Sequence, residues 1–144
     1  FRSLEFLPFA NIVKISDEEL EFITGIADET EALNFLLQGD VEVIIYTKGT
    51  NGAEFITKER KVFSPSFKVE AQDTTGAGDS FIGSFLYQVA EGDNTLESLV
   101  NLPEEKVKEI LTFSNATAAL TVCKRGAIGA LPTKEEVLTL AQGR

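Results

Sequence analysis

The chain has 144 residues, of which 43% are hydrophobic and 25% charged. These proportions suit one globular domain rather than a disordered or membrane segment. Its 13 basic and 23 acidic side chains give a formal net charge of −10, so it lacks the basic surface that nucleic acid or an anionic membrane requires. It has no histidine and a single cysteine, Cys123, which excludes Ser-His-Asp and Cys-His catalysis, ordinary zinc sites and an intrachain disulfide. Any catalytic base must therefore be Asp, Glu, Lys or Tyr.

No secretory signal pattern opens the sequence, and its apolar runs, such as residues 43–45, are far shorter than the ~20 residues of a membrane helix. We therefore expect a cytoplasmic protein. Because the sequence begins with Phe1 and contains no methionine, we also expect it to be part of a longer protein.

The beginning of the chain predicts a strand followed by two helices. Residues 11–15 form a short β-branched run, and Ser16 and Glu19 have the Ser-x-x-Glu spacing of a helix capping box. Residues 28–38 place leucines and an alanine on one helical face, and Gly39 stands where it would end that helix.

Three strands are expected next. Residues 41–47 are β-branched and almost continuously apolar, which is typical of a strand buried on both faces of a parallel sheet. A turn at residues 50–52 leads into a strand over residues 53–57, and a turn at residues 58–59 leads into a strand over residues 61–63. The last two strands form a hairpin at the edge of the sheet.

The second half of the chain is mainly helical. An extended segment over residues 67–71 leads into Gly76-Ala77-Gly78, after which apolar residues recur at helical spacing. Residues 96–102 form a turn or short helix, and Pro103 stands at the first position of the long helix that follows. Residues 134–141 form a terminal amphipathic helix.

Gly76-Ala77-Gly78 lies where an extended segment meets the start of a helix. At such a position, unpaired backbone N–H groups and the helix dipole point toward one spot, which favours an anion and above all a phosphate group. Two well-known phosphate loops do not fit. A P-loop needs lysine after its second glycine, where the chain has Ser84 after Gly83, and the dinucleotide pattern needs glycine where Phe81 stands.

Asp79 lies inside this turn. A carboxylate would repel a resting phosphate there unless it serves a neutral hydroxyl that becomes a nucleophile. An aspartate that accepts a proton from an alcohol, beside donors that hold a transferring phosphoryl group, is the arrangement of a kinase. The alternative is structural, because the dipole favours an acidic residue in the first turn of a helix by about 0.3–1 kcal/mol without any function.

Residues 73–83, reading DTTGAGDSFIG, closely resemble the C-terminal signature of the PfkB, or ribokinase-like, family of carbohydrate kinases. Three further stretches are similar to family motifs in the same order: residues 11–25 to the Asn-x-x-Glu stretch, residues 47–52 to the Thr-x-Gly-x-x-Gly turn, and residues 115–132 to the adenine loop. The resemblance implies an α/β fold, a three-layer α/β/α sandwich with a mostly parallel sheet and an edge hairpin. It also implies that residues 1–144 form the C-terminal, nucleotide-binding and catalytic part of a ribokinase-like domain.

The same resemblance implies ATP-dependent phosphorylation of a sugar hydroxyl. It makes Asp79 the base that deprotonates the hydroxyl, and the N–H groups of Gly76-Ala77-Gly78 the anion hole for charge that develops on the γ-phosphoryl group. Residues 13–25 and 124–133 look most like those of fructokinases, which favours fructose as the substrate and fructose 6-phosphate as the product.

Contacts with the nucleotide are also implied by the resemblance. Thr47 and Gly49 would lie near the phosphates of ATP, and Asn115 beside the adenine. Glu19 matches the glutamate of Asn-x-x-Glu, which helps to place the network of Mg²⁺, water and phosphate. Ser16 departs from the family pattern, because it replaces the asparagine of that motif. Ser16 and Glu19 also fit a plain capping box, and both roles can hold at once.

Asp73 and Thr75 resemble one wall of the monovalent cation site, for K⁺, that many family members contain. The other wall of that site comes from the loop near Gly126. The alternative is an Asx-turn, in which Asp73 only accepts hydrogen bonds from turn amides.

Five other side chains receive no functional role. Lys14 and Lys48 stand close to the motifs, but lysines of this kind are mostly solvated surface charges. Cys123 follows a helix of small residues and is expected to be a buried hydrophobe. Tyr46 and Tyr87 show no partner by spacing and are expected to pack in the core or an interface.

The family recognises its sugar largely through an N-terminal half and a β-sheet lid, and the sequence contains neither. We therefore expect the complete protein to bind sugar and ATP and to form a homodimer through that lid, and we expect no activity from these residues alone. Two alternatives stay open: a kinase for ribose, 2-keto-3-deoxygluconate or a nucleoside, and a non-catalytic regulatory relative that binds nucleotide. The failed glycine pattern disfavours a dinucleotide-dependent redox enzyme.

Overall fold

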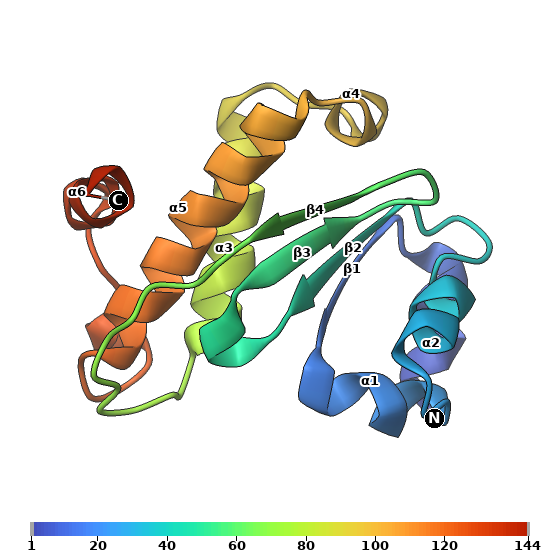
Figure 1. Ribbon diagram of the computed structural model, residues 1–144, viewed down its shortest axis with the longest axis horizontal. Coiled ribbons are helices and arrows are strands. Elements are labelled where there is room, and N and C mark those ends of the chain that lie inside the picture. The colour runs from blue at the N-terminus through green and yellow to red at the C-terminus, as the bar shows by residue number, and fades with distance from the viewer. Residues whose placement is uncertain (1, 144) are drawn as a thin grey trace.

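A four-stranded sheet lies between two layers of helices in the computed structural model, which describes residues 2–143 (Figure 1). The strands, in their order across the sheet, are β1 (Ile12–Ser16), β2 (Val43–Thr47), β3 (Ala53–Ile56) and β4 (Lys61–Ser64). Strands β1 and β2 run parallel, with Ser16 beside Thr47, and the other two pairs are antiparallel.

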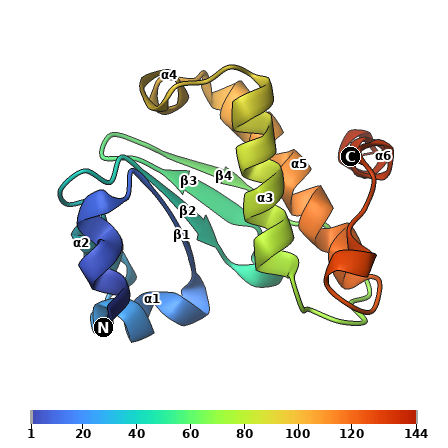
Figure 2. The ribbon, with the colours of Figure 1, turned by 180° about the vertical axis from the view of Figure 1, so that it is seen from behind.

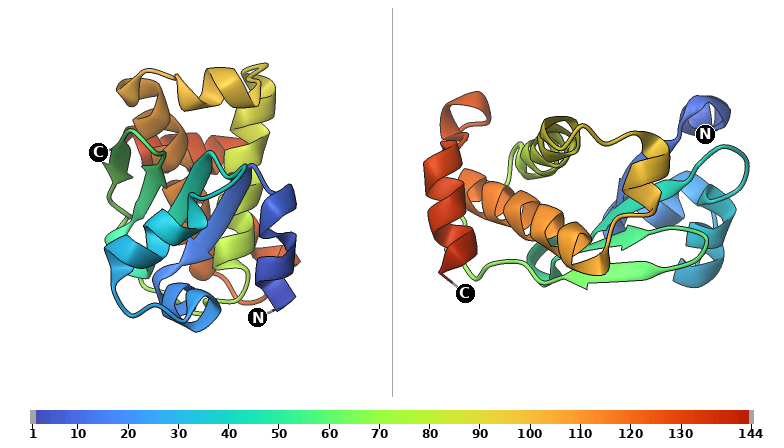
Figure 3. Two further views of the ribbon diagram at one scale, coloured as in Figure 1. Left: turned by 90° about the vertical axis from the view of Figure 1, so that its right-hand side faces the viewer. Right: turned by 90° about the horizontal axis from the view of Figure 1, so that it is seen from above.

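Helices cover both faces of this sheet. Opposite views show α1 and α2 on one face and α3 and α5 on the other (Figures 1 and 2). Helix α6 lies beyond α5, away from the sheet (Figure 3). No helix in residues 2–143 is both long and apolar enough to cross a membrane. The α-helices are α1 (Asp17–Thr24), α2 (Glu29–Leu36), α3 (Ala77–Glu91), α4 (Leu96–Val100), α5 (Glu104–Val122) and α6 (Lys134–Gln142), and the 3₁₀ helices are η1 (Arg2–Phe9), η2 (Gly49–Asn51) and η3 (Ile128–Ala130).

The expected three-layer α/β/α sandwich is confirmed, and so is the hairpin at the sheet edge. The sheet itself was expected to be mostly parallel, but in this chain it is mixed. The reason is connection length: two helices link β1 to β2, whereas the loops on either side of β3 are too short for a parallel crossover.

Strand β2 is buried on both of its faces, as its apolar run predicts. Val43 and Ile45 belong to the core against α3 and α5, while Ile44 and Tyr46 belong to the core against α1 and α2. This is the alternation expected of a strand, and all four side chains are at most 1% exposed. Burying a valine or isoleucine side chain fully contributes about 1.5–3 kcal/mol to folding. Strand β2 therefore contributes to both cores, as does β3 with Phe55 and Ile56.

Some boundaries differ from the expected ones. The second helix ends at Leu36, so Gly39, with φ of 69°, lies in the turn that follows and does not end the helix. Pro103 was expected at the first helical position, but its ψ of 145° is extended and α5 begins at Glu104. Strand β2 begins two residues later than expected. Shifts of one or two residues are usual at helix and strand ends.

Candidate active site

The glycine turn before α3 requires glycine at its last position. Gly76 has φ of 81°, in the left-handed region that residues with a Cβ avoid. Its Cα also lies against the loop after α5, because a Cβ added there would be 3.3 Å from Cβ of Ala127. Gly76 therefore reverses the chain so that α3 begins at the next residue, Ala77.

The free amides at the start of α3 differ from those expected. The N–H of Ala77 donates to the carbonyl of Thr74 at 3.2 Å, so the turn uses that donor here, and its assignment to an anion hole stays a prediction. Within residues 2–143, the N–H groups of Gly76, Gly78 and Asp79 have no acceptor. The amide of Asp79 was missed from sequence, although the rule that the first helical N–H groups lack partners would have found it.

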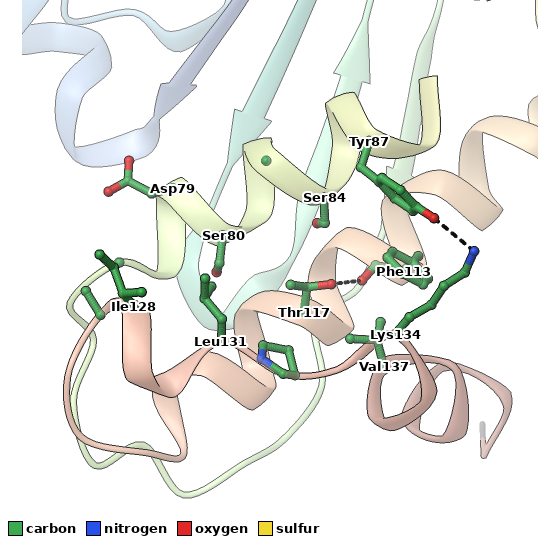
Figure 4. A pocket seen from close by; sticks show the side chains of 14 residues that line it. Asp79, Ser80, Ser84, Tyr87, Phe113, Thr117, Ile128, Leu131, Lys134 and Val137 are labelled. Atoms are coloured by element: carbon green, nitrogen blue, oxygen red, sulfur yellow. Dashed lines mark hydrogen bonds between the residues drawn. The ribbon is translucent and has the colours of Figure 1, made fainter. Parts of the chain in front are cut away.

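Asp79 is exposed in the first turn of α3. It lines one end of a cavity of about 420 Å³ between α3, α5 and the segment leading into α6. Figure 4 shows its carboxylate at the start of α3, pointing away from the contact between Tyr87 and Lys134 at the other end. The carboxylate is thus accessible to a substrate, as a base must be. Other lining residues include Gly83, Phe113, Leu131 and Val137.

Tyr87 and Lys134 line the far end of this cavity, and both contact Glu91 beside it. Lys134 Nζ lies 3.0 Å from the hydroxyl of Tyr87 and 2.8 Å from Oε1 of Glu91, and the Tyr87 hydroxyl donates to the same carboxylate. The bond from Glu91, followed by that from Tyr87, raises the pKa of Lys134. These contacts tie α6 to α3.

A second glycine turn follows β2 at the same end of the sheet as the start of α3 (Figures 1 and 2). The N–H of Lys48 donates to the carbonyl of Gly52 at 2.8 Å and closes the turn. Gly49 is exposed, has φ of 51°, and has no atom within 4 Å of the position of a Cβ. Thr47 ends β2 next to Ser16, the capping partner of Glu19. Thr47 and Glu19, both predicted to lie near the phosphates of ATP, are therefore at the same end of the parallel strands. Lining up strand ends in this way is how open α/β sheets form ligand sites.

Glu19 and Ser16 form the expected capping contact. Oε2 of Glu19 accepts hydrogen bonds from the N–H and the hydroxyl of Ser16, at 2.9 and 2.8 Å. The bond from the Ser16 N–H is the main reason why the pKa of Glu19 is lowered. Its other oxygen, Oε1, accepts no hydrogen bond within the described part of the chain. Glu19 can therefore cap α1 and still offer one oxygen to a ligand.

Lys14 belongs to this site although it was given no role from sequence. Its Nζ lies 3.6 Å from Oε2 of Glu19. A Cβ added to Gly78 would lie 3.1 Å from the same Nζ. One signal was available in the sequence: Lys14 and Ser16 are two residues apart in a strand, so they share a face at its end.

Asn115 is only 3% exposed, and its amide is used within the chain. Nδ2 donates to the carbonyls of Ser64 and Pro65, at 3.1 and 3.3 Å. Asn115 thus holds the segment after β4 against α5, and its place beside adenine stays a prediction.

Asp73 joins two loops. Oδ1 accepts from the N–H of Thr75 at 2.9 Å, which is the expected Asx-turn, and Oδ2 accepts from the N–H of Gly126 at 3.1 Å. Bonds from Thr75, then from Gly126, with the charge of Arg125 nearby, lower the pKa of Asp73 to about 2. The structure therefore brings together Asp73, Thr75 and Gly126, the residues predicted to wall a cation site.

The chain is similar to known proteins over most of its length. Residues 2–134 match the pfkB family carbohydrate kinase profile. A probable fructokinase-2 from Arabidopsis thaliana is 44% identical over 133 residues, covering 90% of this chain and 38% of that protein. A fructokinase with bound ATP from Xylella fastidiosa superposes with a TM-score of 0.87 at 32% identity, covering 95% of this chain and 44% of its own. A fructokinase from Vibrio cholerae O395, solved with fructose, ADP and calcium ion bound, gives a TM-score of 0.83 at 27% identity, covering 94% and 42%.

The family match extends over far more than half of the chain, and the chain therefore belongs to the pfkB family of carbohydrate kinases. The resemblance inferred from residues 73–83 is confirmed, as is the ribokinase-like α/β fold. The chain spans about two fifths of the length of the proteins it matches.

Proposed function

We propose that the complete protein containing this chain transfers the γ-phosphoryl group of ATP to a sugar hydroxyl, and that fructose becomes fructose 6-phosphate. The observation that carries the proposal is the exposed carboxylate of Asp79 beside the free N–H groups of Gly78 and Asp79 at the start of α3. Family membership supports the reaction class. The fructokinases among the similar proteins, one of them solved with fructose and ADP, support the choice of sugar.

In this mechanism, Asp79 accepts the proton of the sugar hydroxyl as its oxygen attacks the γ-phosphorus. A new P–O bond forms to the sugar, the bond from the γ-phosphorus to the β–γ bridging oxygen breaks, and ADP leaves. A base of this kind contributes about 10²–10⁴-fold to the rate. The N–H groups of Gly76-Ala77-Gly78, joined by that of Asp79, would donate to the phosphoryl oxygens, because fixed donors stabilise the negative charge that develops there. Gly76 would allow the phosphate to approach the turn closely.

Other residues at this edge fit the nucleotide and its ions. Thr47 and the open side of Gly49 would lie against the phosphates of ATP, and Asn115 beside the adenine. Glu19 would hold Mg²⁺ through water with its free Oε1, and this ion, when bound, neutralises phosphate charge. Asp73 and Thr75 would form one side of a K⁺ site. Each carboxylate oxygen of Asp73 accepts one hydrogen bond and keeps a second lone pair that could bind the ion.

The remaining parts of the enzyme would lie outside this chain. We propose that residues 1–144 are the C-terminal, nucleotide-binding and catalytic part of the domain. A preceding half would supply the sugar pocket and a lid through which two copies form a dimer. Without that half, the sugar would be neither held in place nor shielded from water, and both effects are large contributions to catalysis.

The test is a panel of hexoses, pentoses and nucleosides, assayed for ATP-dependent phosphorylation by the complete protein with and without potassium. Asp79→Asn is expected to lower turnover of the best acceptor by about 10²–10⁴-fold, while calorimetry finds ATP affinity nearly unchanged. Asp93→Asn, an exposed position after the opposite end of α3, serves as the matched control and is expected to leave turnover intact. Turnover of Asp79→Asn equal to that of the control would reject the base assignment. No phosphorylation of any acceptor by the unmodified protein would favour a non-catalytic, nucleotide-binding relative.

A further inference from the structure

The ammonium of Lys14 lies beside the N-terminus of α3, the end of a helix that carries partial positive charge. Lys14 stands on β1, its side chain is 23% exposed, and Glu19 is its one ion-pair partner within residues 2–143, at 3.6 Å. Its Nζ would lie 3.1 Å from a Cβ on Gly78. The ammonium of this β1 residue therefore reaches the first turn of α3. The N–H of Gly78 is one of the donors that lack an acceptor.

This arrangement places a lysine and the positive end of a helix side by side, with Glu19 as the carboxylate paired to the lysine. The start of a helix carries about half a positive charge, and a lysine beside it adds repulsion rather than stability. Asp79, in the same turn of α3, forms no ion pair with Lys14 within the described part of the chain. A ligand that carries negative charge and accepts hydrogen bonds, such as a phosphoryl group, would satisfy both Lys14 and the free N–H groups.

The other lysine of this region is arranged in the opposite way. Lys48 Nζ lies 2.8 Å from Glu54 and 3.4 Å from Glu29, and it stacks on the ring of Tyr46 with 4.8 Å to the ring centre. Two carboxylates thus neutralise Lys48 within the chain. Lys14 has a single carboxylate partner, at a longer distance, so within residues 2–143 it is the less tightly paired of the two lysines.

We propose that Lys14 is a further catalytic residue, whose ammonium binds the γ-phosphoryl oxygens together with the N–H groups of Gly78 and Asp79. This inference rests on the proposed function. Lys14 transfers no proton, which is the task of Asp79. It stabilises the charge that develops as the γ-phosphoryl group of ATP is transferred to the sugar and ADP is released. Glu19 orients it. Gly78 leaves the ammonium room, since any larger residue would push it away from the turn.

The experiment compares Lys14→Gln with Lys48→Gln in the complete protein. Lys14→Gln is expected to lower kcat for the best acceptor by about 10²–10³-fold, the usual effect of removing one donor to developing charge. The KM for sugar and the Kd of ADP are expected to stay within about threefold, and the Kd of ATP to rise about tenfold, because only ATP has the γ-phosphoryl group. Lys14→Arg, which keeps the charge, is expected to recover part of the loss. Lys48→Gln is expected to leave the ratio of ATP to ADP affinity unchanged.

Two results would overturn the proposal. The first is a Lys14→Gln enzyme with unchanged kcat, in a protein whose unmodified form phosphorylates sugar. The second is an equal loss of ATP and ADP affinity together with a lower Tm, which a merely structural lysine would give. If the unmodified protein phosphorylates no acceptor, the proposed function fails, and the affinities for ATP and ADP still decide whether Lys14 binds a γ-phosphate.

Discussion

The two glycine turns at the active-site end of the sheet look alike in sequence but use glycine for different reasons. In the turn after β2, a Cβ on Gly52 would lie 2.2 Å from the carbonyl oxygen of Ser64, so that glycine lets two backbones touch. In the first turn of α3, Gly78 has no left-handed φ, and its nearest neighbour is the flexible end of Lys14. Gly52, like Gly76, is thus required by the backbone, whereas glycine at position 78 leaves room for the end of Lys14.

This difference predicts how substitutions divide between stability and activity. A clash with backbone cannot be relieved by a small side-chain movement, whereas the end of a lysine can move away. The Gly52 position is therefore expected to report on folding, and the Gly78 position on catalysis.

The largest effect is expected from Gly52→Ala. Its φ of 117° strains any residue with a Cβ, and the contact with Ser64 adds overpacking, so the free energy of unfolding is expected to fall by about 4 kcal/mol. Gly49→Ala is the matched control, because φ of 51° strains alanine but no atom lies within 4 Å of the added Cβ. This substitution is expected to lower the free energy of unfolding by about 1–2 kcal/mol. Urea denaturation of the complete protein measures both, and equal losses would show that packing against β4 is unimportant.

A smaller effect on stability, with a distinct effect on activity, is expected from Gly78→Ala. Alanine favours the helix by up to about 1 kcal/mol over glycine, so Tm is expected to stay the same or rise, while displacement of Lys14 lowers kcat. Gly83→Ala is the control, since it adds the same methyl group to α3 where no atom lies within 4 Å. Denaturation and kinetic assays on both variants sharpen the comparison, and a kcat for Gly78→Ala equal to that for Gly83→Ala would break it.

The smallest effect is expected from the pH dependence that Asp73 contributes. Its pKa is about 2 in the folded chain, below its ordinary value of 3.8, so the folded state favours the ionised form. This stabilisation is complete above about pH 4 and is lost as the pH falls toward 2. Asp73→Asn is expected to make the fall in Tm over that range less steep. An unchanged slope would mean that the bonds from Thr75 and Gly126 do not depend on the charge.

Most of the fold was predictable because its signals are local. The buried run of β2 and the apolar stripe of α3 each follow from the periodicity of a few neighbouring residues. The capping contact between Ser16 and Glu19 also lies within one turn. The mixed character of the sheet was less evident, because it depends on how the hairpin pairs with β2.

The site was predictable only in outline. The spacing around Asp79 indicated a base beside an anion turn, but the bond from Ala77 to Thr74 depends on the geometry that Gly76 imposes. The approach of Lys14 to Gly78 joins residues from separate strands and helices, and no local pattern encodes it. The use of the Asn115 amide to hold the segment after β4 is likewise a contact between distant parts of the chain.

Strand β1 is one of the two outer strands of the sheet, with a neighbour on one side among the described residues. An open strand of this kind is a template onto which another chain can add by backbone hydrogen bonds. Two copies of these residues, prepared by themselves at high concentration, would therefore tend to associate edge to edge. Lys14 is the only charged side chain on that strand, so a substitution that neutralises it also removes the charge that discourages such association.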